Sequence, residues 1–135
     1  MSGRVLALDH GSARCGCAVS DPSGTLATPL GAVARPDTEA GLEELERLVS
    51  EREVERIVVG MPLTLGGEEG EQARAARAFA EALAERVTVP VELHDERLTT
   101  RMAERSGGAR PASDEDSRAA AHLLEGWLTA RGQRA

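Results

Sequence analysis

Two carboxylate residues follow apolar segments that are typical of buried β-strands. Asp9 ends the run over residues 4–9, and Glu96 comes shortly after the run over residues 91–93. In open sheets with parallel strands, ligands gather outside the carboxyl ends of the strands. Acids from two neighbouring strands therefore converge at one edge. Position alone leaves open the alternative that both are solvated strand ends or helix caps.

A third carboxylate, Asp116, interrupts an apolar stripe on the helix that we predict over residues 114–131. Asp116 is followed at spacings of 4, 3 and 4 by Ala120, Leu123 and Trp127, which share one helix face. A charge on the face that packs against a sheet is costly unless it is paired or bound to a metal. The pattern favours a functional acid. The alternatives are an acid stabilised by the helix dipole or a partner for an arginine.

Three carboxylates from distant segments are the ligands that hard divalent cations prefer. Two such ions, about 3.5–4 Å apart, can activate a water and stabilise the leaving oxygen of a phosphodiester. We therefore expect Asp9, Glu96 and Asp116 to be both catalytic residues and ligands of Mg²⁺, with two ions and with Mn²⁺ able to substitute. The three histidines lack metal-ligand spacing, and we expect them in surface or structural roles: His10, His94 and His122.

The composition is that of one globular domain over residues 1–135. Hydrophobic residues make up 41% and charged residues 29% of the chain, as in ordinary soluble proteins. No apolar run approaches the ~20 residues of a membrane span, and none looks like a signal segment. We expect a cytoplasmic protein without membrane contact. Cys15 and Cys17 share one strand face, where a mutual disulfide would be strained, and are expected to be buried free thiols.

The formal net charge of −7 opposes a nucleic-acid partner, because phosphate binding usually shows as a basic surface. However, all sixteen basic side chains are arginines, which present a planar fork to phosphate. The only aromatic residues are Phe79 and Trp127, and both are expected in the core. Base stacking is therefore less plausible than recognition of backbone shape and phosphates. That mode suits structured RNA or branched DNA.

The predicted order of elements is β-β-β-α-β-α-β-α-α. Short links between the first three strands indicate an antiparallel meander, and the alternation of later strands with helices indicates parallel pairing. Strands are expected at residues 4–9, 15–20, 25–33, 56–60 and 91–93. Helices are expected after a cap at Asp37 or Thr38 and at residues 71–87, 98–105 and 114–131, with loops at 60–70 and 106–113 and a frayed tail at 132–135.

Several blocks resemble the YqgF/RuvX family along nearly the whole chain. They cover residues 8–11, 14–22, 58–63, 67–70, 79–80 and 116–120, and the most specific is Asp95-Glu96-Arg97-Leu98-Thr99-Thr100. The resemblance implies an α/β fold of RNase H-like type: a five-stranded mixed sheet, with three antiparallel strands then two parallel strands, and helices on both faces. It also implies a nuclease that processes the 5′ end of the 16S rRNA precursor or, alternatively, resolves Holliday junctions.

By position, the resemblance assigns the three acids of the family to Asp9, Glu96 and Asp116. Because Asp9 ends the central strand, we expect it to bridge both ions. Arg14 and Arg97 lie beside these segments, and we expect them to hold substrate phosphates. Solvation, or a salt bridge to a nearby acid, is the alternative for both. A glycine-rich loop is expected either to close over substrate or to be inert, and its glycines are Gly66, Gly67 and Gly70.

Two other functions stay open at this point. One is a non-catalytic nucleic-acid-binding module of the same fold, which the intact acid trio opposes. The other is an actin-like or sugar-kinase ATPase, which needs two such domains where 135 residues supply one. Oligomeric state is open as well. A homodimer would suit junction resolution, because that reaction needs two active sites, whereas RNA trimming could use one.

Overall fold

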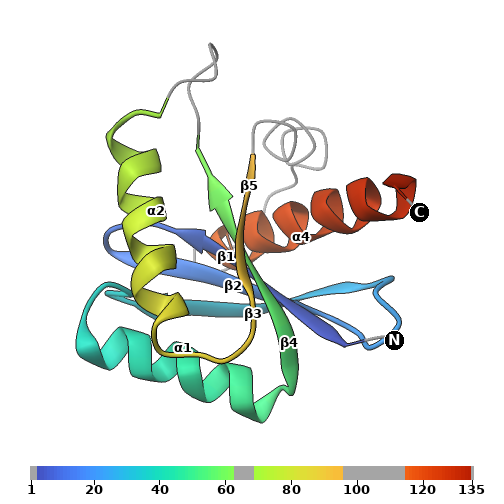
Figure 1. The fold of residues 1–135 in the computed structure, drawn as a ribbon, viewed down its shortest axis with the longest axis horizontal. Helices are drawn as coiled ribbons and strands as arrows, with labels where there is room; N and C mark the ends of the chain where they lie inside the picture. The colour runs from blue at the N-terminus through green and yellow to red at the C-terminus, as the bar shows by residue number, and fades with distance from the viewer. Residues whose placement is uncertain (1–2, 63–68, 96–114, 135) are drawn as a thin grey trace.

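The computed structural model describes residues 3–62, 69–95 and 115–134. The predicted helix at 98–105, the predicted loop at 106–113 and most of the predicted loop at 60–70 lie outside the described residues. Five strands form a single sheet in the order β3-β2-β1-β4-β5 (Figure 1). Their bounds are β1 Arg4–His10, β2 Arg14–Ser20, β3 Ala27–Ala34, β4 Val54–Met61 and β5 Val91–Asp95.

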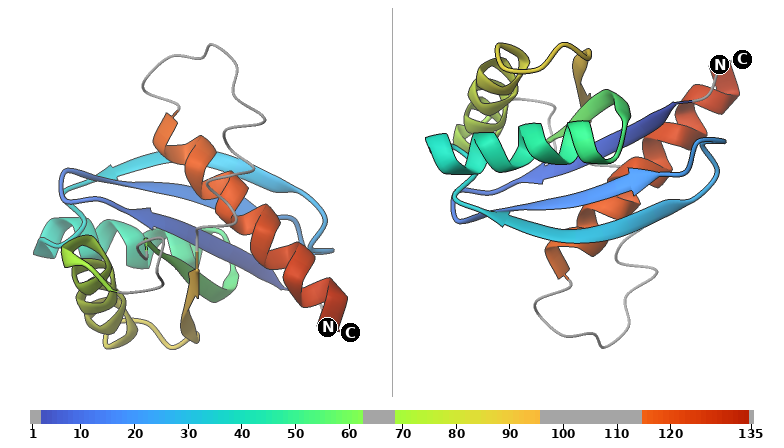
Figure 2. Two further views of the ribbon diagram at one scale, coloured as in Figure 1. Left: turned by 90° about the horizontal axis from the view of Figure 1, so that it is seen from above. Right: turned by 90° about the horizontal axis from the view of Figure 1, so that it is seen from below.

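The strand directions confirm the predicted mixed sheet. β1 pairs with β2, and β2 with β3, in antiparallel fashion, while β4 lies parallel to both β1 and β5. Helices α1 (Glu39–Glu51) and α2 (Glu71–Ala84) cover one face. The long helix α4 (Glu115–Arg134) crosses the other face diagonally (Figure 2). The chain therefore has the predicted α/β architecture of RNase H-like type.

The central strand β1 is apolar on both faces, because helices cover it on both sides. Leu6 and Leu8 point into the core beneath α1 and α2. Val5 and Ala7 alternate with them and pack against α4. The predicted stripe on α4 is confirmed, since Ala120, Leu123 and Trp127 are all buried in this second core. Cys15 and Cys17 are free and buried on the α1 side, as their shared face predicted.

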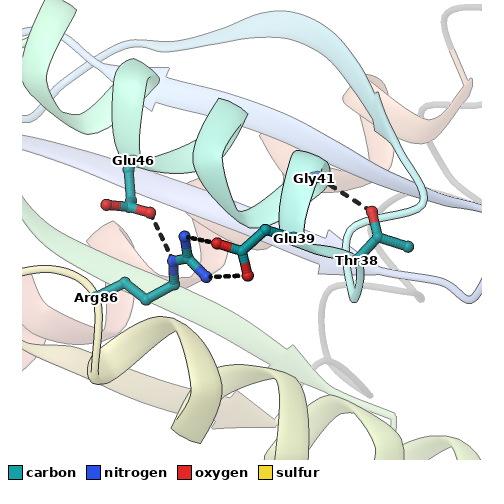
Figure 3. A network of polar contacts seen from close by, with 5 residues as sticks. All are labelled: Thr38, Glu39, Gly41, Glu46 and Arg86. Atoms are coloured by element: carbon teal, nitrogen blue, oxygen red, sulfur yellow. Dashed lines mark hydrogen bonds and ion pairs between the residues drawn. The ribbon is translucent and has the colours of Figure 1, made fainter.

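Polar contacts fix the start of α1 and the chain beyond α2 (Figure 3). The Thr38 hydroxyl caps α1 by accepting a hydrogen bond from the Gly41 amide at 3.2 Å. Arg86 follows α2 and donates to Glu39 at 2.7 Å and to Glu46 at 2.6 Å. These hydrogen bonds raise the pKa of Arg86. Because both carboxylates lie on α1, Arg86 joins the two helices of this face.

Several element ends differ from the prediction by one to three residues. The chain at 132–134 is not a tail, because α4 continues to Arg134. α2 ends at Ala84 rather than Val87, where the chain turns so that Arg86 can reach α1. β3 spans Ala27–Ala34 where residues 25–33 were expected. It includes Pro29, as predicted, because an edge strand with a register shift opposite Cys17 and Ala18 tolerates a proline. None of the described helices combines the length and hydrophobicity that a membrane crossing requires.

Candidate active site

Asp9 lies near the carboxyl end of the central strand, on the face that α4 covers. Strand alternation places it after Val5 and Ala7 on that face. The pKa of Asp9 is raised from 3.8 to about 6. Burial is the main cause, since it disfavours the charged form; the charge of Asp116 adds to it, and His10 partly offsets it. The structure therefore brings Asp9 and Asp116 into electrostatic contact, as the sequence predicted.

Gly16 is what allows α4 to begin beside Asp9. It is the partner of Asp9 in the ladder between β1 and β2. A Cβ atom on Gly16 would lie 1.9 Å from the carbonyl oxygen of Asp116. The first turn of α4 therefore rests directly on the β2 backbone. Sequence reasoning missed this residue, although a glycine inside a strand is a signal of close backbone approach.

Arg14 begins β2 and forms an ion pair with Asp116. The distance from its Nε atom to Asp116 Oδ2 is 2.9 Å, and the Arg14 side chain is 64% exposed, against 33% for Asp116. The salt bridge that the sequence left open as an alternative is thus present. Exposed pairs of this kind contribute only about 0–1 kcal/mol, so Arg14 can exchange partners at little cost. A phosphate-binding role for Arg14 stays a prediction.

Four other predicted residues lie outside the described part of the chain: Glu96, Arg97, Gly66 and Gly67. β5 ends at Asp95, immediately before Glu96 in sequence. Because β1, β4 and β5 are parallel, this end of β5 and the Asp9 end of β1 belong to the same edge of the sheet. Gly70 is described and forms the N-cap of α2 without a capping side chain.

His10 points to the opposite face from Asp9 and has a structural role, as expected for the histidines. Its Nε2 atom lies 2.9 Å from Asp37 Oδ2. Its ring stacks on Phe79, with the ring centroids 4.6 Å apart. These contacts hold the end of β1 against α2 and the start of α1.

Asp9 and Asp116 fit a hard divalent cation by their chemistry. They come from β1 and α4, and the charge of Asp116 disfavours ionisation of Asp9. A bound cation would reverse this penalty, because it becomes the largest local charge. Within residues 3–62, 69–95 and 115–134, no three His, Cys, Asp or Glu side chains form a metal-binding group. Two carboxylates are therefore in place, and the third predicted ligand, Glu96, is not among the described residues.

Comparison with known proteins agrees with the fold and identifies a family. The family model described as "RuvX: Holliday junction resolvase" matches residues 3–130. A protein of Chloroflexus aggregans, named "Putative pre-16S rRNA nuclease", is 43% identical over 94% of each chain. One of Anaeromyxobacter sp. with the same name is 46% identical over 95% of this chain and 98% of its own. The Thermus thermophilus RuvC structure in complex with Holliday junction substrate shares the fold, with a TM-score of 0.64, 17% identity and 98% coverage of both chains.

We predict that Gly16→Ala displaces the start of α4 and separates Asp116 from Asp9. The added methyl group would collide with backbone rather than with a flexible side chain. Overpacking of this kind costs about 1–3 kcal/mol, and the pKa of Asp9 should fall as Asp116 moves away. Chemical denaturation and NMR titration of Asp9 measure the two effects.

Gly31→Ala is the matched control for this variant. Gly31 has a φ of +96° and open space around its Cβ position, so alanine there strains the backbone without touching the site. An unchanged Asp9 titration in Gly16→Ala would show that Gly16 does not position Asp116.

We predict that Asp9→Asn stabilises the metal-free protein in a pH-dependent way. Because the folded-state pKa of about 6 lies above the ordinary 3.8, ionisation of Asp9 costs stability as pH rises through this window. Asparagine cannot ionise, so the free energy of unfolding of the variant should exceed that of wild type by up to about 3 kcal/mol at neutral pH. The difference should vanish below about pH 4. Denaturant titrations in EDTA at several pH values measure it.

Asp21→Asn should behave in the opposite way and serves as the control. Asp21 accepts hydrogen bonds from the Thr25 amide at 2.8 Å and the Leu26 amide at 2.9 Å. These and the Ser23 hydroxyl lower the pKa of Asp21. Ionised Asp21 therefore stabilises the fold at neutral pH, and this effect is lost in acid. The free energy of unfolding of Asp21→Asn should be lower than that of wild type at neutral pH. A pH-independent gap between Asp9→Asn and wild type would contradict the assigned burial of Asp9.

Proposed function

Because the chain belongs to the RuvX family, we propose that it is a metal-dependent nuclease that cleaves structured nucleic acid, with the 5′ end of the 16S rRNA precursor as its substrate. Its relatives carry the name of a nuclease, a hydrolase acting on phosphodiester bonds. The observation that supports this activity most directly is the pairing of a half-buried strand acid with a helix acid. Asp9 and Asp116 lie close together, and the charge of Asp116 disfavours ionisation of Asp9.

The proposed ligands of the metal are Asp9, Glu96 and Asp116, with Asp9 shared between two Mg²⁺ ions and Mn²⁺ able to replace them. Bound Mg²⁺ supplies an activated water and stabilises the leaving oxygen. Asp9 suits the shared position because it ends the central strand, with β2 on one side and β4 on the other. Its partial burial keeps the carboxylate fixed in orientation and disfavours its charged form.

Arg14 is proposed to hold a substrate phosphate. Its side chain is mostly exposed, and its guanidinium contacts Asp116 through Nε. When Asp116 serves as a ligand, the planar fork of Arg14 can turn to a phosphate at small cost. Arg97 is proposed for the same role, and the loop with Gly66, Gly67 and Gly70 is proposed to close over the substrate.

The described aromatic residues favour recognition of the backbone over base stacking. Phe79 is 1% exposed and Trp127 is 6% exposed, so neither ring is available to a base. Binding would then depend on phosphates and helical shape, which suits folded RNA and branched DNA alike. The description of the family as Holliday junction resolvases makes junction cleavage the second candidate. Junction cleavage would call for a homodimer. A role in rRNA processing would make this a cytoplasmic enzyme.

We predict that Asp9→Asn loses Mg²⁺-dependent cleavage of a 16S precursor fragment by more than about 100-fold, because loss of mere supporting partners of a metal ligand already costs 10–100-fold. EDTA should have the same effect on wild type. Asp37→Asn is the matched control: it removes a nearby carboxylate whose hydrogen bond to His10 lies on the other face, and it should retain cleavage. Cleavage by Asp9→Asn at the wild-type rate would refute the site.

A direct comparison of substrates separates the two candidate functions. A precursor fragment and a synthetic four-way junction are cleaved under the same salt and Mg²⁺, since affinity for phosphate backbones depends steeply on salt. We expect faster cleavage of the precursor. Faster cleavage of the junction, with a dimer in solution, would establish the resolvase instead. ATP turnover without cleavage of either would contradict both.

A further inference from the structure

A polar hollow of about 370 Å³ lies beside β5 on the α4 face, apart from the Asp9–Asp116 pair. It is lined by Arg56, Glu92, Leu93, His94, Trp127, Ala130 and Arg131. β4, β5 and the second half of α4 all contribute residues to it. The lining contains two arginines and one carboxylate, so its formal charge is positive in a chain whose net charge is −7.

Hydrogen bonds and a ring contact hold the two arginines in place. Glu92 accepts a hydrogen bond from Arg56 through one oxygen at 2.7 Å, and one from the Trp127 indole through the other at 2.7 Å. The guanidinium of Arg131 lies over the Trp127 ring, 5.1 Å from its centroid. The series Arg56–Glu92–Trp127–Arg131 thus positions a cation at each end of the group.

Arg56 balances the negative charge of Glu92. The positively charged side chain of Arg131 lines the hollow. Among the described residues, the contact found for Arg131 is with the Trp127 ring and not with a carboxylate. The ring itself is buried, so it supports the guanidinium and leaves no face for a base. Two guanidinium groups oppose a bound metal cation. Their planar donors match the oxygens of a phosphate.

The hollow lies on the same face as Asp9 and close to it. Leu8 pairs with Val59, and Gly60 pairs with His94 in the next row. That row continues across the sheet to Asp9, so His94 lies two strands from Asp9, roughly 10 Å away. Gly60 places no side chain between them. A nucleic-acid strand has one phosphate per about 3.4 Å of helix axis, so this span corresponds to about three phosphates. Arg131 lies farther away, since α4 carries it roughly 22 Å along the helix axis from Asp116, a span of about six phosphates.

We propose that Arg131, with Arg56 and His94, forms a second binding site for a phosphodiester group of the substrate, several nucleotides from the bond that is cleaved. This inference rests on the proposed nuclease function. The site extends the contact with the nucleic-acid backbone along the α4 face, away from the carboxylates that repel phosphate. Because phosphate contacts carry no base identity, it strengthens binding of RNA and DNA alike.

Arg131→Gln tests the site through binding in EDTA, where no metal-dependent cleavage occurs. The probe is a labelled RNA hairpin from the 5′ end of the 16S precursor, with a labelled DNA duplex as the second arm. Affinity should fall roughly ten-fold at low salt for both, as expected for loss of a charged hydrogen bond. The slope of log affinity against log salt should become less negative by about 0.7–0.9, the value for one phosphate contact. Arg131→Lys should retain the slope.

Two further variants separate binding from folding. Arg47→Gln removes an exposed arginine on α1, across the sheet from the hollow, and should leave affinity and slope unchanged. Glu92→Gln removes the negative charge and keeps only one of the two hydrogen bonds, because its amide nitrogen cannot accept one. It should still raise affinity, which loss of a structural contact alone would not do. The proposal is overturned if Arg131→Gln and Arg47→Gln bind with equal affinity and slope. If Arg131→Gln alters binding but the wild-type protein shows no Mg²⁺-dependent cleavage, the nuclease function alone is refuted.

Discussion

The contact between the Gly16 backbone and the first turn of α4 is the constraint on which the candidate site depends. Asp9 and Asp116 are more than a hundred residues apart in sequence. They meet because Gly16, the ladder partner of Asp9, has no side chain to hold α4 away from β2. The apolar stripe of α4 then fixes the direction of the helix across the sheet, since Ala120 and Leu123 pack over Ala7 and neighbouring residues. Because Gly16 lacks a Cβ atom, the packing of α4 in the second core also brings Asp116 close to Asp9.

The same geometry raises the free energy of the charged form of Asp9. Packing in the rest of the fold keeps Asp9 in this environment. Burial and Asp116 together disfavour the charge on Asp9. Strand β1 cannot yield by shifting, because Leu6 and Leu8 are fully buried on its other face and its neighbours pair with it on both sides. A one-residue slip would place Asp9 in the α1 core and Leu8 at the site. The carboxylate is thus held in an unfavourable environment by packing, as is common for metal-binding and catalytic groups.

The sheet and the positions of Asp9 and Asp116 could be predicted because apolar runs and helical stripes are visible in short stretches of sequence. The apolar run that ends at Asp9 and the stripe on α4 are local patterns. From them we expected a buried strand that ends in an acid and a carboxylate on the sheet-facing side of the helix. Pairings between distant side chains have no such pattern. Nothing in the sequence distinguishes Arg14 as the partner of Asp116, or joins Glu92 to Trp127, because each depends on the crossing angle of α4. Gly16 did carry a signal, but a glycine in a strand has several meanings until the opposing backbone is known.

The net charge of −7 is the property that most opposes a nucleic-acid partner, and the distribution of ion pairs removes much of its force. On the α1 and α2 face, two arginines form ion pairs with neighbouring acids: Arg86 pairs with Glu39 and Glu46, and Arg77 pairs with Glu69. On the α4 face, Arg14 is mostly exposed and Arg131 rests on an aromatic ring. Of the acids on that face, Asp9 and Asp116 are those whose repulsion a metal ion would relieve. Because several pairs are confined to the α1 and α2 face and Arg131 contacts a ring, the net charge of the whole chain says little about what the α4 face binds.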